Sequence, residues 1–481
     1  MNIGTLPARH GRYRSDHTAL VTGGSRLTFR ELDRRTARLA AAFQAAGIAR
    51  GGAIATALPN GAALYETYWA AARIGAATVP LSPLLRAEAV RALAADADAS
   101  LLLTDESQVE ALIAGVPPDA APSVPAIAPE DVFNIMYSSG TTGTPKGIVL
   151  SYAVRAAYGL LFASQWRMTP ESVVLHAGSL VFNGAFVTMM PAMFLGATFV
   201  LLEQFEPERV LRAIEREAVT HVMMVPSQIV ALLNAPGFEA GRLASLQMLG
   251  SVGAPLHREH RDRLIAHLPG RLYELYGLTE GFVTVLDSRD FAARRDSVGV
   301  PAAFSELRIV DSGGADLGSG AVGQIVGRGP LLMSGYYRRP DLTAQAVVDG
   351  WLQSGDLGFV DEDGFLHLVD RQKDLIVSGG VNVYPRDIEE VIVTHPEVSE
   401  AAVFGVPDDK WGEAPLAAVV RRARATVSAE ALTSWINDRV AARYQRVSAV
   451  VFLDELPRNA AGKTLKRVLR APYWAQRATQ I

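Results

Sequence analysis

The sequence of 481 residues contains no cysteine, which excludes disulfides, thiolate metal sites and a catalytic thiol. A thioester made by this protein would therefore need a thiol that arrives with a substrate. Lysine is scarce too, and a codon bias that replaces exposed lysine by arginine accounts for this. The lysines that remain are enriched where a compact ammonium is needed and a planar guanidinium would not serve. They are Lys146, Lys373, Lys410, Lys463 and Lys466.

The chain also lacks an excess of positive charge. Its formal net charge is −4 and its isoelectric point is about 6.2, so neither nucleic acid nor an anionic membrane is an expected partner. The segment from Met1 to Arg14 has no apolar core, so we see no signal peptide and expect a cytoplasmic protein. Hydrophobic residues make up 49% and charged residues 20%, which is typical of a globular protein. The length predicts two or more domains.

Charge is missing altogether from one long stretch, Ser172 to Leu202, which has no Lys, Arg, Asp or Glu. A membrane span needs about 20 apolar residues, so this stretch must be weighed as one. Polar residues, glycine and proline interrupt it, and we favour a buried helix followed by a strand from Ala197 to Leu202. We expect the break between helix and strand to run from Pro191 to Gly196.

Strands and helices alternate in the first part of the chain. Strands are predicted at 53–58, 77–81 and 100–104, and a helix at 62–74 that ends at Gly75. Thr28 and Glu31 form a capping box at the start of an earlier helix. This rhythm predicts an α/β fold with parallel sheets. Beyond Val300, Asp-Gly and Gly-x-Gly turns predict an antiparallel β subdomain.

The stretch Tyr-Ser-Ser-Gly-Thr-Thr-Gly-Thr-Pro-Lys-Gly, from Tyr137 to Gly147, lies between two predicted strands. Its backbone N–H groups, hydroxyls and single ammonium suit phosphate, and glycines let the backbone approach a ligand closely. It is not a Walker A loop, because the required spacing is absent. A flexible Gly/Thr hairpin is the plainer alternative. The phosphate-binding candidates are Ser138, Ser139, Gly140, Thr141, Thr142, Gly143 and Lys146.

This stretch resembles the signature of the adenylate-forming superfamily, which includes acyl-CoA synthetases, adenylation domains and luciferases. Three further motifs follow in the family's order. Tyr-Gly-Leu-Thr-Glu spans Tyr276 to Glu280, Ser-Gly-Asp ends at Asp356, and Pro-x-x-x-x-Gly-Lys ends at Lys463. The resemblance covers essentially the whole chain.

The resemblance implies a two-domain architecture. Residues 1–370 would form a large N-terminal domain of parallel or mixed sheets with helices, together with the antiparallel β subdomain. Residues 371–481 would form a small, mobile α+β domain, joined by a hinge near 370–374. Within this hinge the motif position corresponds to Lys373. The C-terminal domain would rotate between two half-reactions, and the strand with Gly379 and Gly380 would then face the thiol tunnel.

The resemblance also implies what each motif residue does. The 138–147 loop would hold the β- and γ-phosphates of ATP, Thr279 would contact the α-phosphate, and Glu280 would hold Mg²⁺. Asp356 would accept the ribose hydroxyls, assisted by Arg371, and Lys463 would reach the α-phosphate and the substrate carboxylate. We therefore expect Lys463, Thr279 and Glu280 to be catalytic. Tyr276, with Gly277 beside it, would stack on adenine, and the adenine would pack against Gly253, Ala254 and Pro255.

The expected activity is activation of a carboxylic acid to acyl-AMP with release of pyrophosphate, followed by transfer to coenzyme A. In amino-acid adenylation domains an Asp after a Phe pairs with the substrate ammonium. The corresponding pair here is Phe182 and Asn183, which disfavours amino acids. An apolar, aromatic pocket favours an aryl, arylpropenoic or medium-chain acid. Its expected wall is Phe182, Asn183, Gly184, Phe186, Met189, Met190 and Phe282.

Two alternatives stay open at this point. One is a stand-alone adenylation enzyme that loads a carrier-protein pantetheine. The other is a non-catalytic nucleotide-binding protein, against which the joint presence of Lys463, Glu280 and Asp356 argues. The sequence does not decide whether the protein is a homodimer. In place of the family's usual Tyr-Lys-x-Pro, the chain has Tyr444-Gln445-Arg446-Val447, so contacts to the CoA phosphate are not carried over there.

Overall fold

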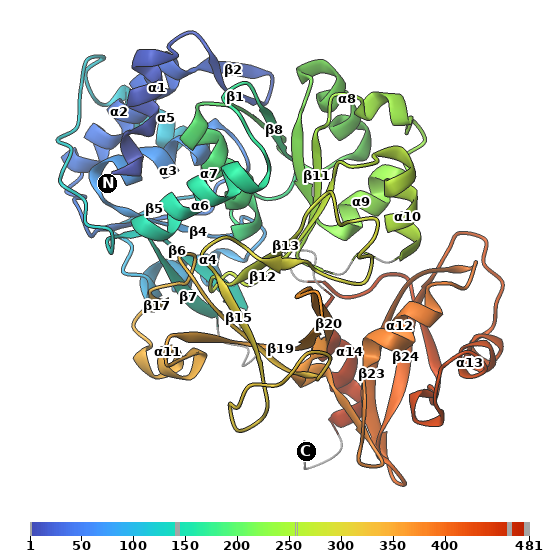
Figure 1. Cartoon of the computed structure of the whole chain (residues 1–481). Helices are drawn as coiled ribbons and strands as arrows, with labels where there is room; N and C mark the ends of the chain where they lie inside the picture. The colour runs from blue at the N-terminus through green and yellow to red at the C-terminus, as the bar shows by residue number, and fades with distance from the viewer. Residues whose placement is uncertain (1, 140–144, 255, 257, 459–463, 476–481) are drawn as a thin grey trace.

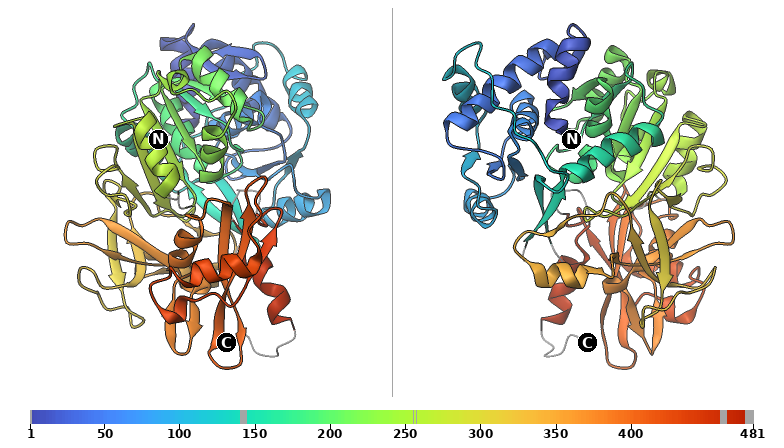
Figure 2. Two further views of the ribbon diagram at one scale, coloured as in Figure 1. Left: turned by 90° about the vertical axis from the view of Figure 1, so that its right-hand side faces the viewer. Right: turned by 60° about the vertical axis from the view of Figure 1, so that its left-hand side comes forward.

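The computed structural model describes residues 2–139, 145–254, 256, 258–458 and 464–475 of the chain. Two large sheets and the helices between and around them form the first 300 residues (Figure 1). A smaller antiparallel sheet follows, and a fourth sheet belongs to the C-terminal part. In both views of Figure 2 this orange-to-red part lies at the lower end of the molecule.

The first large sheet has nine strands among the described residues, and its central strands are parallel. The antiparallel strands lie at its two edges. In spatial order the strands are β14 (Val300–Pro301), β13 (Val283–Leu286), β12 (Leu272–Gly277), β11 (Met248–Val252), β10 (His221–Met224), β8 (Val173–His176), β9 (Thr198–Leu201), β1 (Thr18–Thr22) and β2 (Ser25–Thr28).

The second large sheet has six strands among the described residues and carries the loop motif at its antiparallel end. In spatial order they are β17 (Gly335–Tyr336), β7 (Pro145–Ser151), β6 (Val132–Ser139), β4 (Ala77–Pro80), β3 (Ala53–Thr56) and β5 (Leu101–Leu103). The central strands are buried along their whole length, as expected for parallel strands covered on both faces. The predicted α/β class with mixed sheets is confirmed.

The helices begin and end where the sequence signals them. Thr28 caps α2 (Phe29–Ala45) through the predicted capping box with Glu31, and Gly75 ends α3 (Ala62–Ile74) in a left-handed conformation. The other helices of the first two-thirds are α1 (Leu6–Tyr13), α4 (Ala87–Asp96), α5 (Glu106–Ala114), α6 (Tyr152–Gln165), α7 (Asn183–Leu195), α8 (Pro207–Glu217), α9 (Pro226–Leu233) and α10 (Arg258–His267). Among the described residues, no helix is long and apolar enough to span a bilayer.

Helix α7 corrects one expectation. The uncharged stretch does form a buried helix and then a strand, but the helix continues through Pro191 and ends only at Gly196. Proline at 191 leaves the carbonyl of Val187 without its usual helical donor. The indole Nε1–H of Trp166 donates to this carbonyl at 2.9 Å, so the bond lost inside the helix is replaced from outside it.

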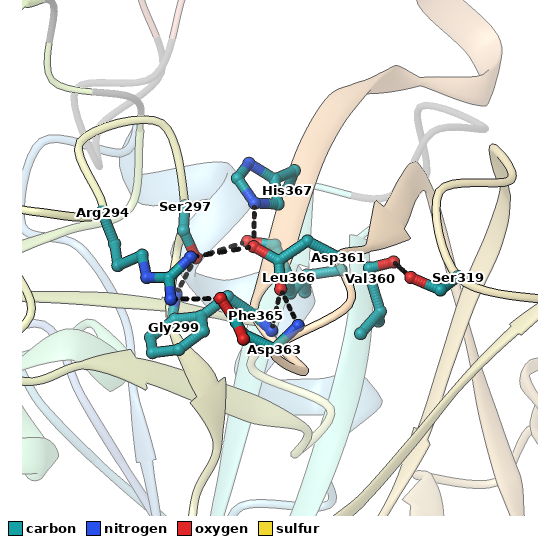
Figure 3. A network of polar contacts seen from close by, with 10 residues as sticks. All are labelled: Arg294, Ser297, Gly299, Ser319, Val360, Asp361, Asp363, Phe365, Leu366 and His367. Atoms are coloured by element: carbon teal, nitrogen blue, oxygen red, sulfur yellow. Dashed lines mark hydrogen bonds and ion pairs between the residues drawn. The ribbon is translucent and has the colours of Figure 1, made fainter.

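The antiparallel subdomain predicted beyond Val300 is present. Its strands are β15 (Glu306–Val310), β16 (Gly323–Arg328), β18 (Val347–Val348), β19 (Trp351–Val360) and β20 (Leu366–Arg371), and α11 (Pro340–Ala346) lies beside them. The turn between β19 and β20 is fixed by Asp361, whose carboxylate accepts from the backbone N–H of Phe365 at 2.9 Å and lies 2.9 Å from His367 Nε2 (Figure 3). Arg294 forms an ion pair with Asp363 of the same turn. These contacts hold the subdomain to the loop at 294–299.

The C-terminal part has its own sheet and core. Its strands are β21 (Ile376–Ser378), β22 (Val381–Val383), β23 (Val398–Asp408), β24 (Gly412–Arg421) and β25 (Val450–Leu453), and its helices are α12 (Pro385–Ile392), α13 (Ala429–Asn437) and α14 (Lys466–Trp474). Pro385 stands at the first turn of α12, as its fixed backbone angle favours. The buried apolar clusters of this part draw only on residues from Ile376 onward.

Candidate active site

The β6–β7 hairpin presents the loop motif. Ser138 and Lys146 face each other across the two strands, and Ser139 is the last residue of β6. The base of the hairpin is anchored by Tyr137, whose hydroxyl donates to Asp96 at 2.6 Å, while Arg339 pairs with the same carboxylate at 2.7 Å. The residues between the strands, Gly140, Thr141, Thr142 and Gly143 among them, lie outside the described residues.

Tyr336 connects the loop lysine to the predicted metal ligand. Its hydroxyl donates to Glu280 Oε1 at 3.0 Å, and the Lys146 ammonium lies 5.1 Å from the centre of its ring. Burial and the Glu280 carboxylate raise the pKa of Tyr336, so the hydroxyl stays protonated and remains a donor. Tyr336 sits on β17, which pairs with β7, so the hairpin positions this tyrosine directly.

Thr279 and Glu280 lie in the turn between β12 and β13. Gly281, the next residue, has a φ of +131°, and a side chain there would come within 2.2 Å of the Leu331 carbonyl oxygen. The backbone N–H of Met333 donates to the Glu280 carbonyl at 2.8 Å. The turn is therefore pressed against the 331–333 segment, which fixes the backbone at Glu280.

Tyr276 and Asp356 are brought together from 80 residues apart in the chain. The Tyr276 hydroxyl donates to Asp356 Oδ2 at 2.7 Å, and Arg371 Nε lies 3.5 Å from Asp356 Oδ1. Burial and the neighbouring carboxylate raise the pKa of Tyr276 well above its usual value, so it acts as a donor here. The backbone N–H of Asp356 donates to Ser354 Oγ at 3.0 Å, which holds the backbone at this position.

Gly253 and Ala254 follow the end of β11, on the same edge of the sheet as Tyr276 and Gly277 of neighbouring β12. Both are exposed, so their backbone is accessible to a flat ring. Pro255 lies outside the described residues.

The predicted acid-binding residues surround the start of α7. Phe182 is the N-cap residue of this helix and Asn183 its first residue. Gly184 comes next, and a side chain built there would lie 4.0 Å from Val252 at the end of β11. The start of α7 therefore faces the segment predicted to pack against adenine.

Four of the predicted wall residues are buried in the core. Phe186 is fully buried, with its ring beneath the guanidinium of Arg155 at 3.9 Å. Phe282 packs into the core of the antiparallel subdomain, against Gly327, where any side chain would come within 2.2 Å of its ring. The structure therefore brings Phe182, Asn183 and Gly184 together and places Phe282 in a different core. Met189 and Met190 are also fully buried, in the same core as Phe186.

The expected thiol-tunnel glycines form the turn between β21 and β22. Both have positive φ, +60° at Gly379 and +80° at Gly380, and a side chain at Gly379 would meet the ring of Trp411 at 2.7 Å. Lys373 lies in the short 3₁₀ segment Gln372–Asp374 that precedes β21, and it is exposed. Lys463 lies outside the described residues, between Arg458 and Thr464, which pair in an isolated bridge.

Sequence reasoning missed Tyr336, Arg155 and Asn134. The only signal for Arg155 is its position on the apolar face of α6, three residues before Tyr158 and seven before Phe162. Neither Tyr336 nor Asn134 carries a local signal, because their partners are far away in the chain.

Comparison with known proteins now decides the family. The model of the AMP-binding enzyme family matches residues 7–337, and the model of its C-terminal domain matches residues 387–463. The chain belongs to the AMP-binding enzyme family. This family is the adenylate-forming superfamily that the motifs indicated.

Several relatives of this AMP-binding enzyme match along its whole length. A feruloyl-CoA synthase from an Amycolatopsis species is 37% identical over an alignment of 496 residues, gaps included. The alignment covers 98% of this chain and 99% of the relative. The ATP-bound structure of MatB from Rhodopseudomonas palustris has a TM-score of 0.89 and 29% identity, with 98% and 99% covered. The o-succinylbenzoate CoA synthetase of Bacillus subtilis, in complex with its acyl-adenylate, has a TM-score of 0.87 and 28% identity, with 97% of each chain covered.

As a member of this superfamily the protein is an AMP-forming acid–thiol ligase. Its described residues contain no group of three or more His, Asp or Glu side chains placed to hold a metal ion. Magnesium fits this site nevertheless, because it commonly takes one or two carboxylates together with substrate phosphates. Glu280 supplies such a carboxylate, half-buried and oriented by Tyr336.

Proposed function

We propose that the protein is an ATP-dependent acyl-CoA ligase for an aryl, arylpropenoic or medium-chain carboxylic acid. The observation that supports this most is the linked set Lys146–Tyr336–Glu280, together with Tyr276–Asp356–Arg371. The first set offers a cation and a carboxylate for phosphates and Mg²⁺, and the second a carboxylate for ribose hydroxyls. The names of relatives such as feruloyl-CoA synthase point to the same reaction class.

The first half-reaction forms a mixed anhydride. An oxygen of the substrate carboxylate attacks the α-phosphorus of ATP, the bond from that phosphorus to the bridging oxygen breaks, and pyrophosphate leaves. Catalysis consists of positioning and of placing cations where negative charge develops. Lys146 would hold the leaving phosphates, Thr279 would donate to the α-phosphate, and Glu280 would hold Mg²⁺, which would neutralise phosphate charge. Lys463 supplies the cation at the α-phosphate.

The second half-reaction forms the thioester. The thiol of CoA gives up its proton to solvent and its sulfur attacks the acyl carbon, the bond from that carbon to the phosphate oxygen breaks, and AMP leaves. We propose that residues 1–370 and 371–481 act as two domains and that the second turns about the hinge at 370–374 between the half-reactions. The Gly379–Gly380 turn would then line the path of the thiol, because glycine leaves a narrow path open.

The product profile tests this function. The protein is incubated with ATP, Mg²⁺, CoA and a panel of aryl, arylpropenoic and medium-chain acids, and the products are read by mass. AMP, pyrophosphate and an acyl-CoA are the expected products, whereas ADP would reject the mechanism. Acceptance of the acyl group by a carrier protein but not by free CoA would favour the adenylation-enzyme alternative.

Lys463→Ala separates the two half-reactions. Loss of one preorganised donor costs on the order of 10²- to 10³-fold in rate, so formation of the adenylate should fall by that factor. With chemically prepared acyl-adenylate, the variant should still acylate CoA at near the parent rate, because Lys463 would have turned away. Arg209→Ala, which removes an exposed cation of α8 that pairs with Glu206, is the control and should change neither rate. A Lys463→Ala variant slow in both steps would contradict the assignment.

A further inference from the structure

Arg155 is a fully buried cation below the start of α7. Its exposed fraction is 0%, and its side chain points from α6 into the core between β6 and α7. Its Nε donates to Asn134 Oδ1 at 2.9 Å and its Nη1 to Asn183 Oδ1 at 2.9 Å. The guanidinium also lies over the rings of Phe186 at 3.9 Å and Tyr158 at 4.8 Å.

No carboxylate of the described residues forms an ion pair with Arg155, although most other buried or half-buried arginines have one. Burial lowers the pKa of Arg155 to about 10, which still leaves it charged at neutral pH. A buried charge without a counter-ion is costly, and an apolar side chain of similar length would usually serve stability as well or better. We therefore look for the role of Arg155 in the side chains that it binds, Asn134 and Asn183.

The neighbour that reaches the acid-binding region is Asn183. An arginine can only donate hydrogen bonds, so the carboxamide of Asn183 must turn its oxygen toward Arg155. Its nitrogen then points away and donates one hydrogen to the Tyr158 hydroxyl at 2.9 Å. The second N–H of this amide is left over, and Asn183 is half-buried at the start of α7, so a ligand can reach it. Asn183 thus offers this N–H donor to a ligand, while its oxygen is turned toward Arg155.

We propose that Arg155, by holding Asn183 in this orientation, makes the pocket select acids whose acyl group carries a hydrogen-bond-accepting oxygen. This inference rests on the proposed acyl-CoA ligase function and names the substrate class within it. The guanidinium polarises the amide it binds, which strengthens the remaining N–H as a donor. A purely hydrocarbon acyl group leaves that donor without a partner, and an ammonium meets a donor and a nearby positive charge. Arg155 is a positioning residue, and Asn183 contacts the substrate.

Pairs of acids that differ in one atom group test the proposal. The 2-, 3- and 4-methoxycinnamic acids are each compared with the ethylcinnamic acid of the same ring position, in which CH₂ replaces the oxygen. Release of pyrophosphate with ATP and Mg²⁺ gives kcat/KM for each acid. At one ring position or more, the methoxy acid should exceed its ethyl partner by about tenfold, since the ethyl group leaves the donor unpaired.

Arg155→Met should bring this ratio to within about twofold of one, because Asn183 is then free to turn. Arg155→Lys keeps a cation that can bind only one of the two asparagines well, and should give an intermediate ratio. A merely structural role would lower kcat/KM for both acids of a pair equally and leave the ratio unchanged.

Arg167→Met is the matched control, because Arg167 pairs with Asp287 near the surface, and its ratio should equal that of the parent. If Arg155→Met fails to fold by circular dichroism, Asn183→Leu removes the donor directly and should abolish the preference.

Each other outcome overturns a definite claim. Ratios near one at all three positions in the parent, or a preference that survives both Arg155→Met and Asn183→Leu, would overturn the role of Arg155. Hexanoic acid is included in the panel. Activity with hexanoic acid alone would leave the ligase function standing and overturn this inference, and no pyrophosphate release with any acid would overturn the proposed function itself.

Discussion

At the scale of single residues, Tyr336 is the clearest case of a side chain that acts through two others. Its hydroxyl orients the Glu280 carboxylate, and its ring lies beneath the Lys146 ammonium. A phenylalanine at this position would keep the ring, and with it the cation–π contact, but not the hydroxyl. The two contributions can therefore be separated by one substitution.

Tyr336→Phe should raise the Mg²⁺ concentration needed for half-maximal rate and lower kcat/KM by on the order of tenfold. A hydrogen bond to a charged group contributes about 1.5 kcal/mol or more, and Glu280 loses one here. Steady-state pyrophosphate release across a Mg²⁺ titration measures both quantities. Tyr337→Phe is the control, because that hydroxyl donates to Asp98, away from Glu280. Equal Mg²⁺ dependence in Tyr336→Phe and the parent would show that Tyr336 does not orient the carboxylate.

The residues found from sequence are those that stand in short, contiguous motifs. The hairpin, the Tyr276–Glu280 turn and Asp356 all belong to this group. Arg155 contacts Asn134 and Asn183 across 21 and 28 positions, and Tyr336 contacts Glu280 across 56. No local pattern encodes such pairs, because they depend on how α6, α7 and β17 pack. Phe282, expected in the wall of the acid pocket, packs into the core of the antiparallel subdomain, and the sequence pattern did not indicate which core receives its side chain.

At the scale of elements, α7 shows how a helix keeps a proline in its interior. Helix ends were predictable where glycine takes the left-handed conformation, as at Gly75 and Gly196. The continuation through Pro191 was not, because the donor that makes it tolerable comes from Trp166, outside the helix. The sequence predicted a break somewhere between Pro191 and Gly196, and α7 ends at the later of these two limits.

A double-mutant cycle tests this replacement. Trp166→Phe leaves the Val187 carbonyl buried without that donor, which should reduce the free energy of unfolding by about 1–3 kcal/mol in addition to the lost packing. In the Pro191→Ala background the helix regains its own N–H at 191, so Trp166→Phe should cost about 1 kcal/mol less there. Thermal or denaturant unfolding of the four proteins gives the coupling. Additive effects would mean that the indole N–H does not substitute for the missing helical bond.

At the scale of the whole molecule, Asp370 lies where β20 leads into the C-terminal part. Its carboxylate accepts from the backbone N–H of Arg386 at 3.2 Å, and the nearby Lys466 ammonium pairs with Glu389 at 2.7 Å. Burial, opposed by Lys466 and assisted by Glu389, raises the pKa of Asp370 to about 6. One cation is thus shared by two carboxylates, and one of them tends to take up a proton.

The sign of the pH dependence follows from this shift. Because the folded pKa lies above the unfolded value, the stability contributed by protonated Asp370 is present at low pH and is lost as pH rises through about 6. Relative to the parent, Asp370→Asn should therefore gain about 1 kcal/mol in unfolding free energy between pH 5.0 and pH 7.5. Unfolding curves of both proteins at the two pH values measure the gain.

Asp287→Asn provides the control for this pH comparison. Burial tends to raise the pKa of Asp287, but the hydrogen bonds from Arg167 and from the backbone N–H of Arg289, together with the charges of both arginines, outweigh it and the pKa is lowered. This carboxylate stays ionised over the whole interval, so its substitution should give the same difference from the parent at both pH values. If the difference in unfolding free energy between Asp370→Asn and the parent is also the same at both pH values, the raised pKa of Asp370 is contradicted.

Strand β6 has a consequence for how new specificities could arise. Asn134, which helps to hold Arg155, stands on the same strand as Ser138 and four residues before it, in the hairpin that we propose binds the phosphates of ATP. If this proposal holds, a change at Asn134 would also disturb the strand that positions the phosphate-binding residues. Arg155 stands on α6 and Asn183 on α7, and neither helix contains a residue of the predicted phosphate-binding motif. Mutant libraries aimed at new acids should therefore vary residues of these two helices and leave β6 unchanged. The substitutions then fall outside the strand that carries the predicted phosphate-binding residues.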